Sequence, residues 1–300
     1  QIRLLLPEGG ANPYYAQFGW VGTATSTDVP PPDARWTADR ETLTPDSPVT
    51  LTWTSANGVR FALKVALDAN FMFTVTQRID NTGSVPVSVY PFGRLRRTGT
   101  PHTADFYILH EGPIGVINGT LTENSYDDLK KQNTIEKKAT TGWFGLTDKY
   151  WLVALVPDST KEKTTRFSHT GTNGSERYQI DYLEPAVSVA PGASVEVANR
   201  FFAGAKEVRL LDRYASELGI ERFDFAVDWR DEGDTPGRND KGMVTFDRRT
   251  RKDAFFFYQA SWTDTPVLHV TARRFTPRTD RKSTRLNSSH SQQSRMPSSA

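Results

Sequence analysis

Two runs, Val59-Arg-Phe-Ala-Leu-Lys-Val-Ala-Leu67 and Phe71-Met-Phe-Thr-Val-Thr76, decide the predicted fold. In both runs, large apolar residues occupy every second position. Side chains on a strand point to opposite faces at each step, so this period predicts two strands that bury one face. The polar triplet Asp68-Ala-Asn70 between them predicts a hairpin turn.

The same pattern continues along the chain. We expect further strands at 85–89, 115–121, 150–156, 178–183 and 194–202. Turn signals separate the strands at Asn57-Gly58, Asn81-Thr-Gly83, Asn118-Gly119 and Asn173-Gly174. The charged stretch 127–138 is expected to be an exposed loop with a short helical turn. Many short strands with little helix predict a mainly β protein, a large antiparallel sandwich.

Helical periodicity is clear only near residues 206–219. Val208, Leu211, Tyr214 (or Ala215) and Leu218 fall on one helical face, and Gly219 is a suitable stop. The sequence therefore predicts an amphipathic helix after the last strand of the β domain.

Composition limits the class of protein. The 300 residues are 37% hydrophobic with a mean hydropathy of −0.55, and no apolar run approaches the roughly 20 residues of a spanning helix. No leader segment and no initiator Met open the chain, which predicts a start within a longer gene product. Cysteine is absent, which excludes disulfides and thiolate sites.

Residues 1–229 hold 23 Lys/Arg and 27 Asp/Glu, whereas residues 230–300 hold 14 Lys/Arg and 8 Asp/Glu. This asymmetry predicts a boundary near residue 229.

Known catalytic and binding motifs are missing. The five histidines (His102, His110, His169, His269 and His290) show no metal-ligand spacing and are expected to be scattered on the surface. There is no phosphate loop and no nucleophile elbow. The basic clusters 94–97 and 248–252 lack interleaved aromatics, so nucleic acid is not an expected partner. We therefore predict no enzyme, cofactor or metal site and favour a binding or scaffolding role. Whether the sandwich holds an extended peptide or a lipid tail stays open.

Several strings point to a known family. They are Tyr14-Tyr-Ala-Gln-Phe-Gly-Trp20, Gly99-Thr-Pro-His-Thr-Ala-Asp105, Tyr126-Asp-Asp-Leu-Lys-Lys131, Gly142-Trp-Phe-Gly-Leu-Thr-Asp-Lys-Tyr-Trp151 and Phe202-Ala-Gly-Ala-Lys-Glu-Val208. Over residues 1–229 the chain resembles the periplasmic domain of YidC-type membrane protein insertases. The resemblance implies a β-supersandwich like that of galactose mutarotases. It also implies a chaperone-like role in the insertion, folding and assembly of inner-membrane proteins, alone or with the Sec translocon.

The resemblance also implies partners and a location. It places this domain in the periplasm at the bacterial inner membrane, with a Sec accessory subunit and nascent inner-membrane proteins as partners. The transmembrane insertase core would be missing from this chain. We expect coupling to the partner on the helix at 207–220, through Glu207, Val208, Leu211, Tyr214, Leu218 and Ile220. The alternative is that this helix only seals the sandwich.

The remainder of the chain has a different character. Residues 230–279 resemble a fragment of family 2 glycoside hydrolases, the β-galactosidase group, and would form a small α/β fragment. That family's catalytic glutamates lie upstream, so no catalytic residue is assigned. Residues 280–300 resemble a translated sequencing adapter and are expected to be disordered. The chain is thus hypothesised to be a chimera. The alternative function is that of a carbohydrate-active protein, a β-galactosidase-like fragment or a mutarotase-like sugar binder.

Overall fold

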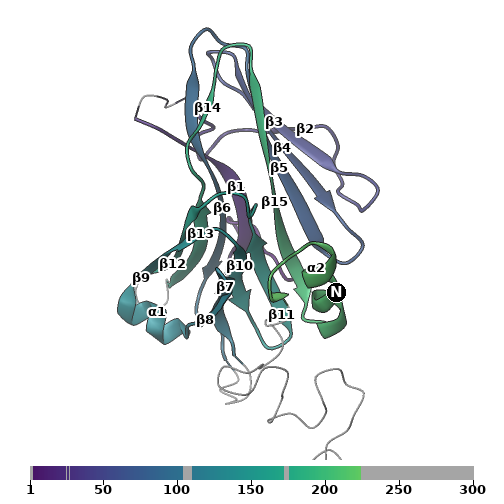
Figure 1. Ribbon diagram of the computed structural model, residues 1–300, viewed down its shortest axis with the longest axis vertical. Helices are drawn as coiled ribbons and strands as arrows, with labels where there is room; N and C mark the ends of the chain where they lie inside the picture. The colour runs from purple at the N-terminus through teal and green to yellow at the C-terminus, as the bar shows by residue number, and fades with distance from the viewer. Residues whose placement is uncertain (1–2, 25, 27, 104–109, 172–175, 224–300) are drawn as a thin grey trace, which may run out of the picture. The chain divides into compact units, whose positions relative to one another are not determined.

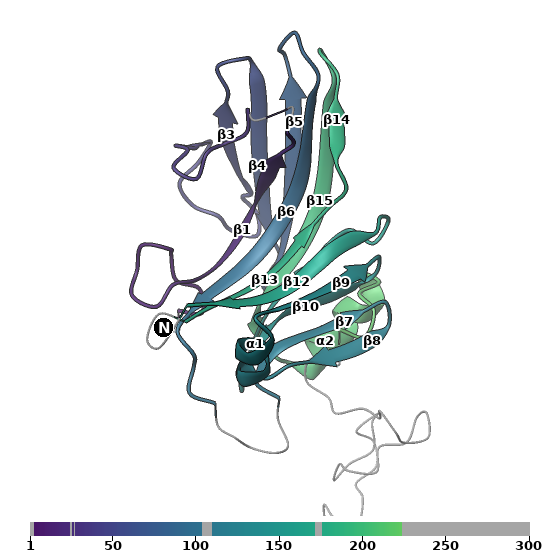
Figure 2. The same ribbon diagram turned by 90° about the vertical axis from the view of Figure 1, so that its left-hand side faces the viewer.

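Two antiparallel sheets that face each other form the described part of the protein. The computed structural model describes residues 3–223, except 25, 27, 104–109 and 172–175. One sheet has the strand order β1-β6-β13-β12-β9, with β14 also paired to β6, and the other has the order β2-β3-β4-β5-β15-β11-β10-β7-β8. Figures 1 and 2 show the two sheets from two sides, with α1 (Tyr126–Gln132) immediately before the start of β9. The prediction of a large antiparallel sandwich is confirmed.

The strands have the following bounds. The smaller sheet contains β1 (Tyr14–Gly22), β6 (Val87–Thr98), β9 (Thr134–Ala139), β12 (Lys163–Thr170), β13 (Arg177–Leu183) and β14 (Val187–Val189). The larger sheet contains β2 (Thr37–Ala38), β3 (Val49–Thr54), β4 (Val59–Leu67), β5 (Met72–Asn81), β7 (Gly112–Ile117), β8 (Thr120–Glu123), β10 (Gly142–Thr147), β11 (Trp151–Val156) and β15 (Ser194–Ala205).

The main core lies between the sheets, and the alternation in β4 shows why. Val59, Phe61 and Leu63 are buried and belong to this core, whereas Arg60 and Lys64 on the opposite face are exposed. Burying one face and hydrating the other is the usual arrangement of an antiparallel sheet. The period of two in the sequence therefore corresponds to a real division between core and solvent.

Strand β11 is different because it is apolar at every position. Val153 and Leu155 belong to the core between the sheets, whereas Leu152, Ala154 and Val156 belong to a second apolar cluster on the outer face of the larger sheet. A strand covered on both faces needs a continuous apolar run. The second layer of cover is α2 (Val208–Glu217), which Figure 1 shows beside β11 and β15.

Two hairpins depart from the sequence expectation. The strand expected at 115–121 is divided into β7 and β8 by the turn that was also expected at Asn118 (φ 49°) and Gly119 (φ 80°). Paired positive φ values are those of a tight I′ hairpin turn, which Asn-Gly adopts readily. At the β4–β5 turn, Phe71 was expected in register with Phe73 on the buried face. It lies before β5 instead, with φ 70° and 56% of its surface exposed.

The charged stretch 127–138 was expected to be an exposed loop with a short helical turn. The helical turn is present as α1, whereas the remainder of the stretch is not a loop but most of strand β9. Ser125 and Asp128 make a reciprocal capping box at the start of α1, which supplies partners for helix amides that would otherwise lack them. Leu129 is fully buried on the inner side, and β9 pairs with β12. One buried leucine and one strand pairing thus order a mostly polar segment.

The predictions for residues 230–279 and 280–300 lie outside the described residues, as does the Asn173-Gly174 turn.

Candidate functional site

The predicted coupling helix lies on the outer face of the larger sheet. We call the surface beneath it the helix seat. This surface consists of Met72, Ile114, Val116, Trp143, Leu152, Ala154, Val156 and Phe202. Leu211 and Tyr214 of α2, with Ile220 and Phe223 just after it, are buried against the seat. The helix therefore covers apolar sheet surface that would otherwise face water.

The six residues predicted for partner coupling fall into two groups. Leu211, Tyr214 and Ile220 are buried, Leu218 is half-buried against the same apolar cluster, and Val208 is half-buried. Glu207 is exposed and is the residue at which α2 begins, but its side chain makes no capping hydrogen bond. The structure thus brings the apolar members together against the sheet, where they hold the helix. Arg209 and Glu217 lie on the exposed side.

The Asp68 carboxylate connects the helix to the β4–β5 turn. Its Oδ1 accepts hydrogen bonds from the backbone N–H groups of Asn70 (2.8 Å) and Met72 (2.9 Å), and its Oδ2 accepts from the Tyr214 hydroxyl (2.5 Å). Burial and this hydrogen bond raise the pKa of Tyr214 above its ordinary value, so the phenol stays a donor. The same carboxylate thus fixes both the turn that presents Phe71 and the position of α2.

The segment that follows α2 is also attached to the seat. The Trp143 indole N–H donates to the Glu221 carbonyl (3.1 Å), and the Trp143 ring meets the Phe223 ring edge-on with centroids 5.3 Å apart. Thr141 donates to the Glu221 carboxylate (3.1 Å). These contacts hold the C-terminal end of the helical segment on the sheet.

Lys206 lies between β15 and α2. Its ammonium donates to the Thr147 hydroxyl (2.9 Å). Burial lowers the pKa of Lys206 to about 8, although the charges of Glu111 and Asp148 act in the opposite direction. The half-buried ammonium of Lys206 therefore lies just before α2 and contacts the end of β10, next to the β10–β11 turn.

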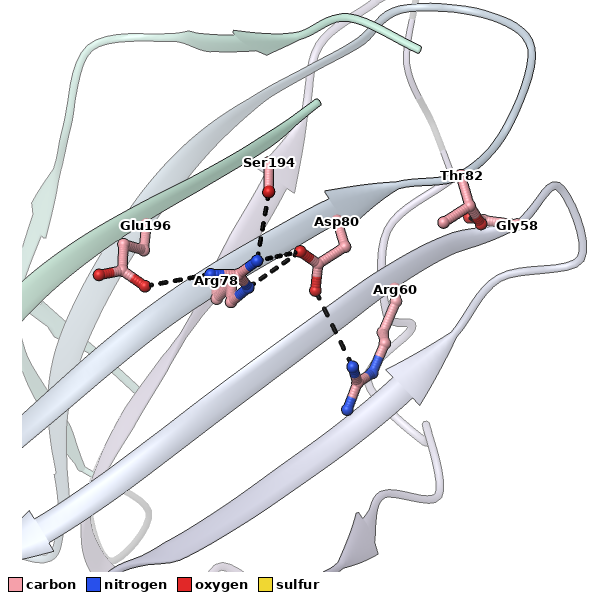
Figure 3. Close-up of polar contacts among 7 residues, drawn as sticks. All are labelled: Gly58, Arg60, Arg78, Asp80, Thr82, Ser194 and Glu196. Carbon is pink, nitrogen blue, oxygen red and sulfur yellow. Dashed lines mark hydrogen bonds and ion pairs between the residues drawn. The ribbon is translucent and has the colours of Figure 1, made fainter. Parts of the chain in front are cut away.

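Beyond the helix seat, the outer face of the larger sheet is polar. Figure 3 shows Arg78 of β5 donating to Asp80, Ser194 and Glu196, with Arg60 of β4 forming an ion pair with Asp80 at 4.0 Å. Beside this network, Thr82 donates to the Gly58 carbonyl. The hydrogen bond from Arg78 holds the pKa of Asp80 below its ordinary value. These charged side chains keep the uncovered part of the face hydrated.

The histidines and basic residues have structural roles that the sequence did not show. His169 is buried, not on the surface as expected, and its Nε2 lies 2.7 Å from the Glu176 carboxylate. Neither residue lines the two described cavities. The basic cluster 94–97 is part of β6, where Arg94 donates to Gln17 and Arg96 to Gln179. Within the described ranges, no group of three potential ligands is placed to hold a metal ion.

Sequence reasoning missed Asp68, Lys206 and the residues around the β10–β11 turn. One indication of a structural role for Asp68 is present in the sequence, which is its position at the start of an Asp-Ala-Asn turn. Nothing in the sequence pairs it with Tyr214, 146 positions away. In the part of the chain that the structure describes, no helix has the length and apolarity to cross a membrane.

Comparison with known proteins agrees with the sequence resemblance. Residues 1–230 match the model of the YidC periplasmic domain family. Proteins named "Membrane protein insertase YidC" from Beijerinckia indica, Sinorhizobium fredii and Rickettsia canadensis are 45%, 44% and 39% identical to the chain. Each alignment covers 76% of this chain and 38%, 39% and 41% of the relative, respectively. The chain thus spans about two fifths of the length of these relatives.

Solved structures with a similar shape are more distant. A galactose mutarotase-like protein from Lactobacillus casei is 11% identical with a TM-score of 0.44, and the match covers 64% of this chain and 85% of that one. A galactose mutarotase related enzyme from Lactobacillus acidophilus gives 9% identity and a TM-score of 0.42 over 57% and 71%. The family match over residues 1–230 and the insertase relatives at 39–45% identity show that this chain belongs to the YidC periplasmic domain family.

Proposed function

We propose that this chain supplies the periplasmic domain of a bacterial inner-membrane insertase, which assists the insertion, folding and assembly of inner-membrane proteins. The observation that carries the proposal is the family match over residues 1–230, together with relatives named as membrane protein insertases. The domain has no catalytic role in this proposal. The carbohydrate-active alternative is not favoured, because the mutarotase-like neighbours are only 9–11% identical.

The location can be tested in a full-length relative. Residues 1–230 would replace the matching domain of the Sinorhizobium fredii insertase, to which they are 44% identical. In spheroplasts, external protease should cleave within the exchanged domain, and in inverted vesicles the domain should be protected. Protection in spheroplasts combined with cleavage in inverted vesicles would contradict a periplasmic location.

For α2 we propose a coupling role to a Sec accessory subunit through its exposed side. Leu211, Tyr214 and Ile220 are buried against the helix seat, so they would act by positioning the helix rather than by touching a partner. Arg209 and Glu217 are exposed on the opposite side and are available to a partner. This division fits an amphipathic helix whose polar face is exposed to solvent.

A photo-crosslinking amino acid at Arg209 or Glu217 of the exchanged full-length insertase tests this coupling. We expect adducts with the Sec accessory subunit from these positions. The matched control position is Glu196, which is exposed on the same face of the larger sheet but outside the helix seat. Equal adducts from all three positions, or none from α2, would remove the coupling role and leave a helix that only seals the sandwich.

We further propose that residues 230–279 derive from a glycoside hydrolase of family 2 and residues 280–300 from an adapter. The end of the family match at residue 230 supports a boundary there. Sequencing the source DNA through the codon for Trp229 should show a transmembrane segment in the natural gene. An uninterrupted natural reading frame through residue 300 would contradict the chimera.

A further inference from the structure

A cavity of about 300 Å³ lies on the outer face of the smaller sheet, across β6, β13, β12 and β9, which Figure 2 shows side by side. Its lining includes Phe92, Arg94, Glu136, Arg166, Asp181 and Leu183. Cavities of this size hold small organic ligands, and an apolar wall with a few convergent polar groups is typical of such sites. The cavity shares no residue with α2 or with the helix seat, which belong to the other sheet.

Four charged side chains of alternating sign form a row across the cavity. In the register of the sheet, Arg94 lies opposite Asp181 and Asp181 lies opposite Arg166. Glu136 lies opposite Arg166 on the next strand. Residues directly opposite each other on antiparallel strands project from the same face of the sheet. The core on the inner face takes the adjacent positions in these strands, which include Leu95, Ile180 and Phe167. All four charged side chains therefore project from the outer face.

Asp181 and Arg166 form a fixed pair within the row. The Asp181 side chain is only 10% exposed, and its carboxylate accepts from Arg166 Nη2 (3.1 Å) and Nε (3.3 Å) and from the Gln179 amide (2.6 Å). Its charge is therefore already compensated. Arg166 uses Nε and Nη2 in this pair, so among the described residues its Nη1 has no partner. The Arg166 side chain is 46% exposed and lines the cavity, so a ligand there can reach the guanidinium.

Glu136 is the unpaired acid at the end of the row. It is exposed, and in the part of the chain that the structure describes its carboxylate has no hydrogen bond and no ion pair. Residues opposite each other on neighbouring strands have Cβ atoms roughly 5 Å apart, so an unused cationic donor and an unused anionic acceptor stand side by side on β12 and β9. An α-amino acid carries its carboxylate and its ammonium on one carbon and can therefore bind both.

The wall beside the charged row is apolar. Phe92 and Leu183 are half-buried and lie opposite each other on β6 and β13. Phe92 also lies opposite Gly19 of β1, where a Cβ would be 3.1 Å from Phe92 Cε1, so the missing side chain lets the ring lie against β1. Two cations and two acids line the cavity, which leaves no net charge and matches a zwitterion better than an anion or a cation.

We propose that this cavity binds a zwitterionic α-amino acid with a large apolar side chain. The ligand carboxylate accepts from Arg166 Nη1, and the ligand ammonium donates to Glu136. The apolar side chain lies against Phe92 and Leu183. This binding is additional to the proposed periplasmic function and does not depend on it.

Calorimetric titration of the full 300-residue chain with phenylalanine at neutral pH tests this proposal, and the methyl signals of Val21 and Leu183, which both line the cavity, locate the site in NMR spectra. We expect one saturable site. Phenylalaninamide lacks the carboxylate and N-acetylphenylalanine lacks the ammonium, so each should bind at least threefold more weakly. Glycine lacks the apolar side chain and should bind at least tenfold more weakly. No saturable binding, or equal binding of phenylalanine and either blocked derivative, would overturn the proposal.

Glu136→Gln tests the ammonium site without removing any contact of the folded chain. It should weaken phenylalanine binding about fivefold, since an ion pair at an exposed position is lost, and should not weaken binding of N-acetylphenylalanine. The matched control is Glu123→Gln, because Glu123 is an exposed strand residue that does not line the cavity; its affinity should stay within twofold of the parent chain. Unchanged affinity in Glu136→Gln, or equal losses in both variants, would overturn the assignment.

Discussion

Replacing Leu211 by Ala measures how much of the stability of this domain depends on the helix seat. Leu211 is fully buried between α2 and the outer face of the larger sheet. The substitution removes roughly three carbon groups, which at about 0.8 kcal/mol each amounts to ~2.4 kcal/mol of lost transfer free energy. The seat is a sheet surface that includes Trp143, which is itself fully buried, so it has little freedom to close around the space. A residual cavity adds to the cost.

We therefore expect Leu211→Ala to lower the free energy of unfolding by about 3 kcal/mol. Equilibrium urea unfolding of the full chain, followed by far-ultraviolet circular dichroism and by tryptophan fluorescence, measures this loss. If both signals change in a single transition, and the slope of the free energy of unfolding against urea concentration equals that of the parent chain, the domain still unfolds as one unit. Two separate transitions would show instead that α2 detaches before the sheets unfold.

The control lies on the same helix. Arg209 is exposed, and Arg209→Ala should change the free energy of unfolding by less than about 0.5 kcal/mol. A loss below about 1 kcal/mol for Leu211→Ala, with an unchanged urea dependence, would refute the burial of α2 against the sheet. The outer layer would then contribute little to the stability of the fold.

Three other perturbations test separate parts of the structure. Tyr214→Phe removes the donor to Asp68 and should cost about 1–2 kcal/mol in urea unfolding, since a hydrogen bond to a charged group is lost; no loss would contradict the link between helix and turn. Gly145→Ala would place a Cβ 2.0 Å from the Val153 carbonyl oxygen and should destabilise the domain by at least ~2 kcal/mol, whereas Gly9→Ala, with nothing within 4 Å, should be tolerated. For Lys206, whose pKa falls from 10.5 to about 8 on folding, the unfolded chain binds more protons between pH 8 and 10.5. Its contribution to stability should therefore rise with pH in that window; Lys206→Met should remove this rise, and an ammonium titrating near 10.5 in NMR would contradict it.

Alternation and turn chemistry correctly predicted most of the sandwich. The period of two in β4 and the Asn-Gly turn after β7 are local signals, because side-chain direction and positive φ depend on the residues themselves. The same reasoning failed for β9, although it indicated the helical turn before it. There, order comes from the buried side chains of Tyr126, Leu129 and Ala139 and from pairing with β12, a strand that lies about 25 residues further along the chain.

The candidate site divides in the same way. Helical periodicity indicated the apolar face of α2, with Leu211 and Tyr214 on it, because residues three and four positions apart lie on the same face of a helix. It did not indicate what the face would cover. The continuous apolar run of β11 is explained only by the tertiary structure, in which α2 covers the second face of that strand.

By itself, the sequence determined the class of fold, the family, and the existence of an amphipathic helix after the last strand. Only the tertiary structure decided which polar side chains are buried and with what partners. Lys163 is nearly fully buried because its ammonium donates to the carbonyls of Thr140 (3.0 Å) and Asp158. The pairs Tyr214–Asp68 and Arg97–Asp148 likewise join residues that are 146 and 51 positions apart. A buried polar group is costly without a hydrogen-bond partner. Where a distant segment supplies that partner, as Asp68 does for Tyr214, no local pattern in the sequence contains the information.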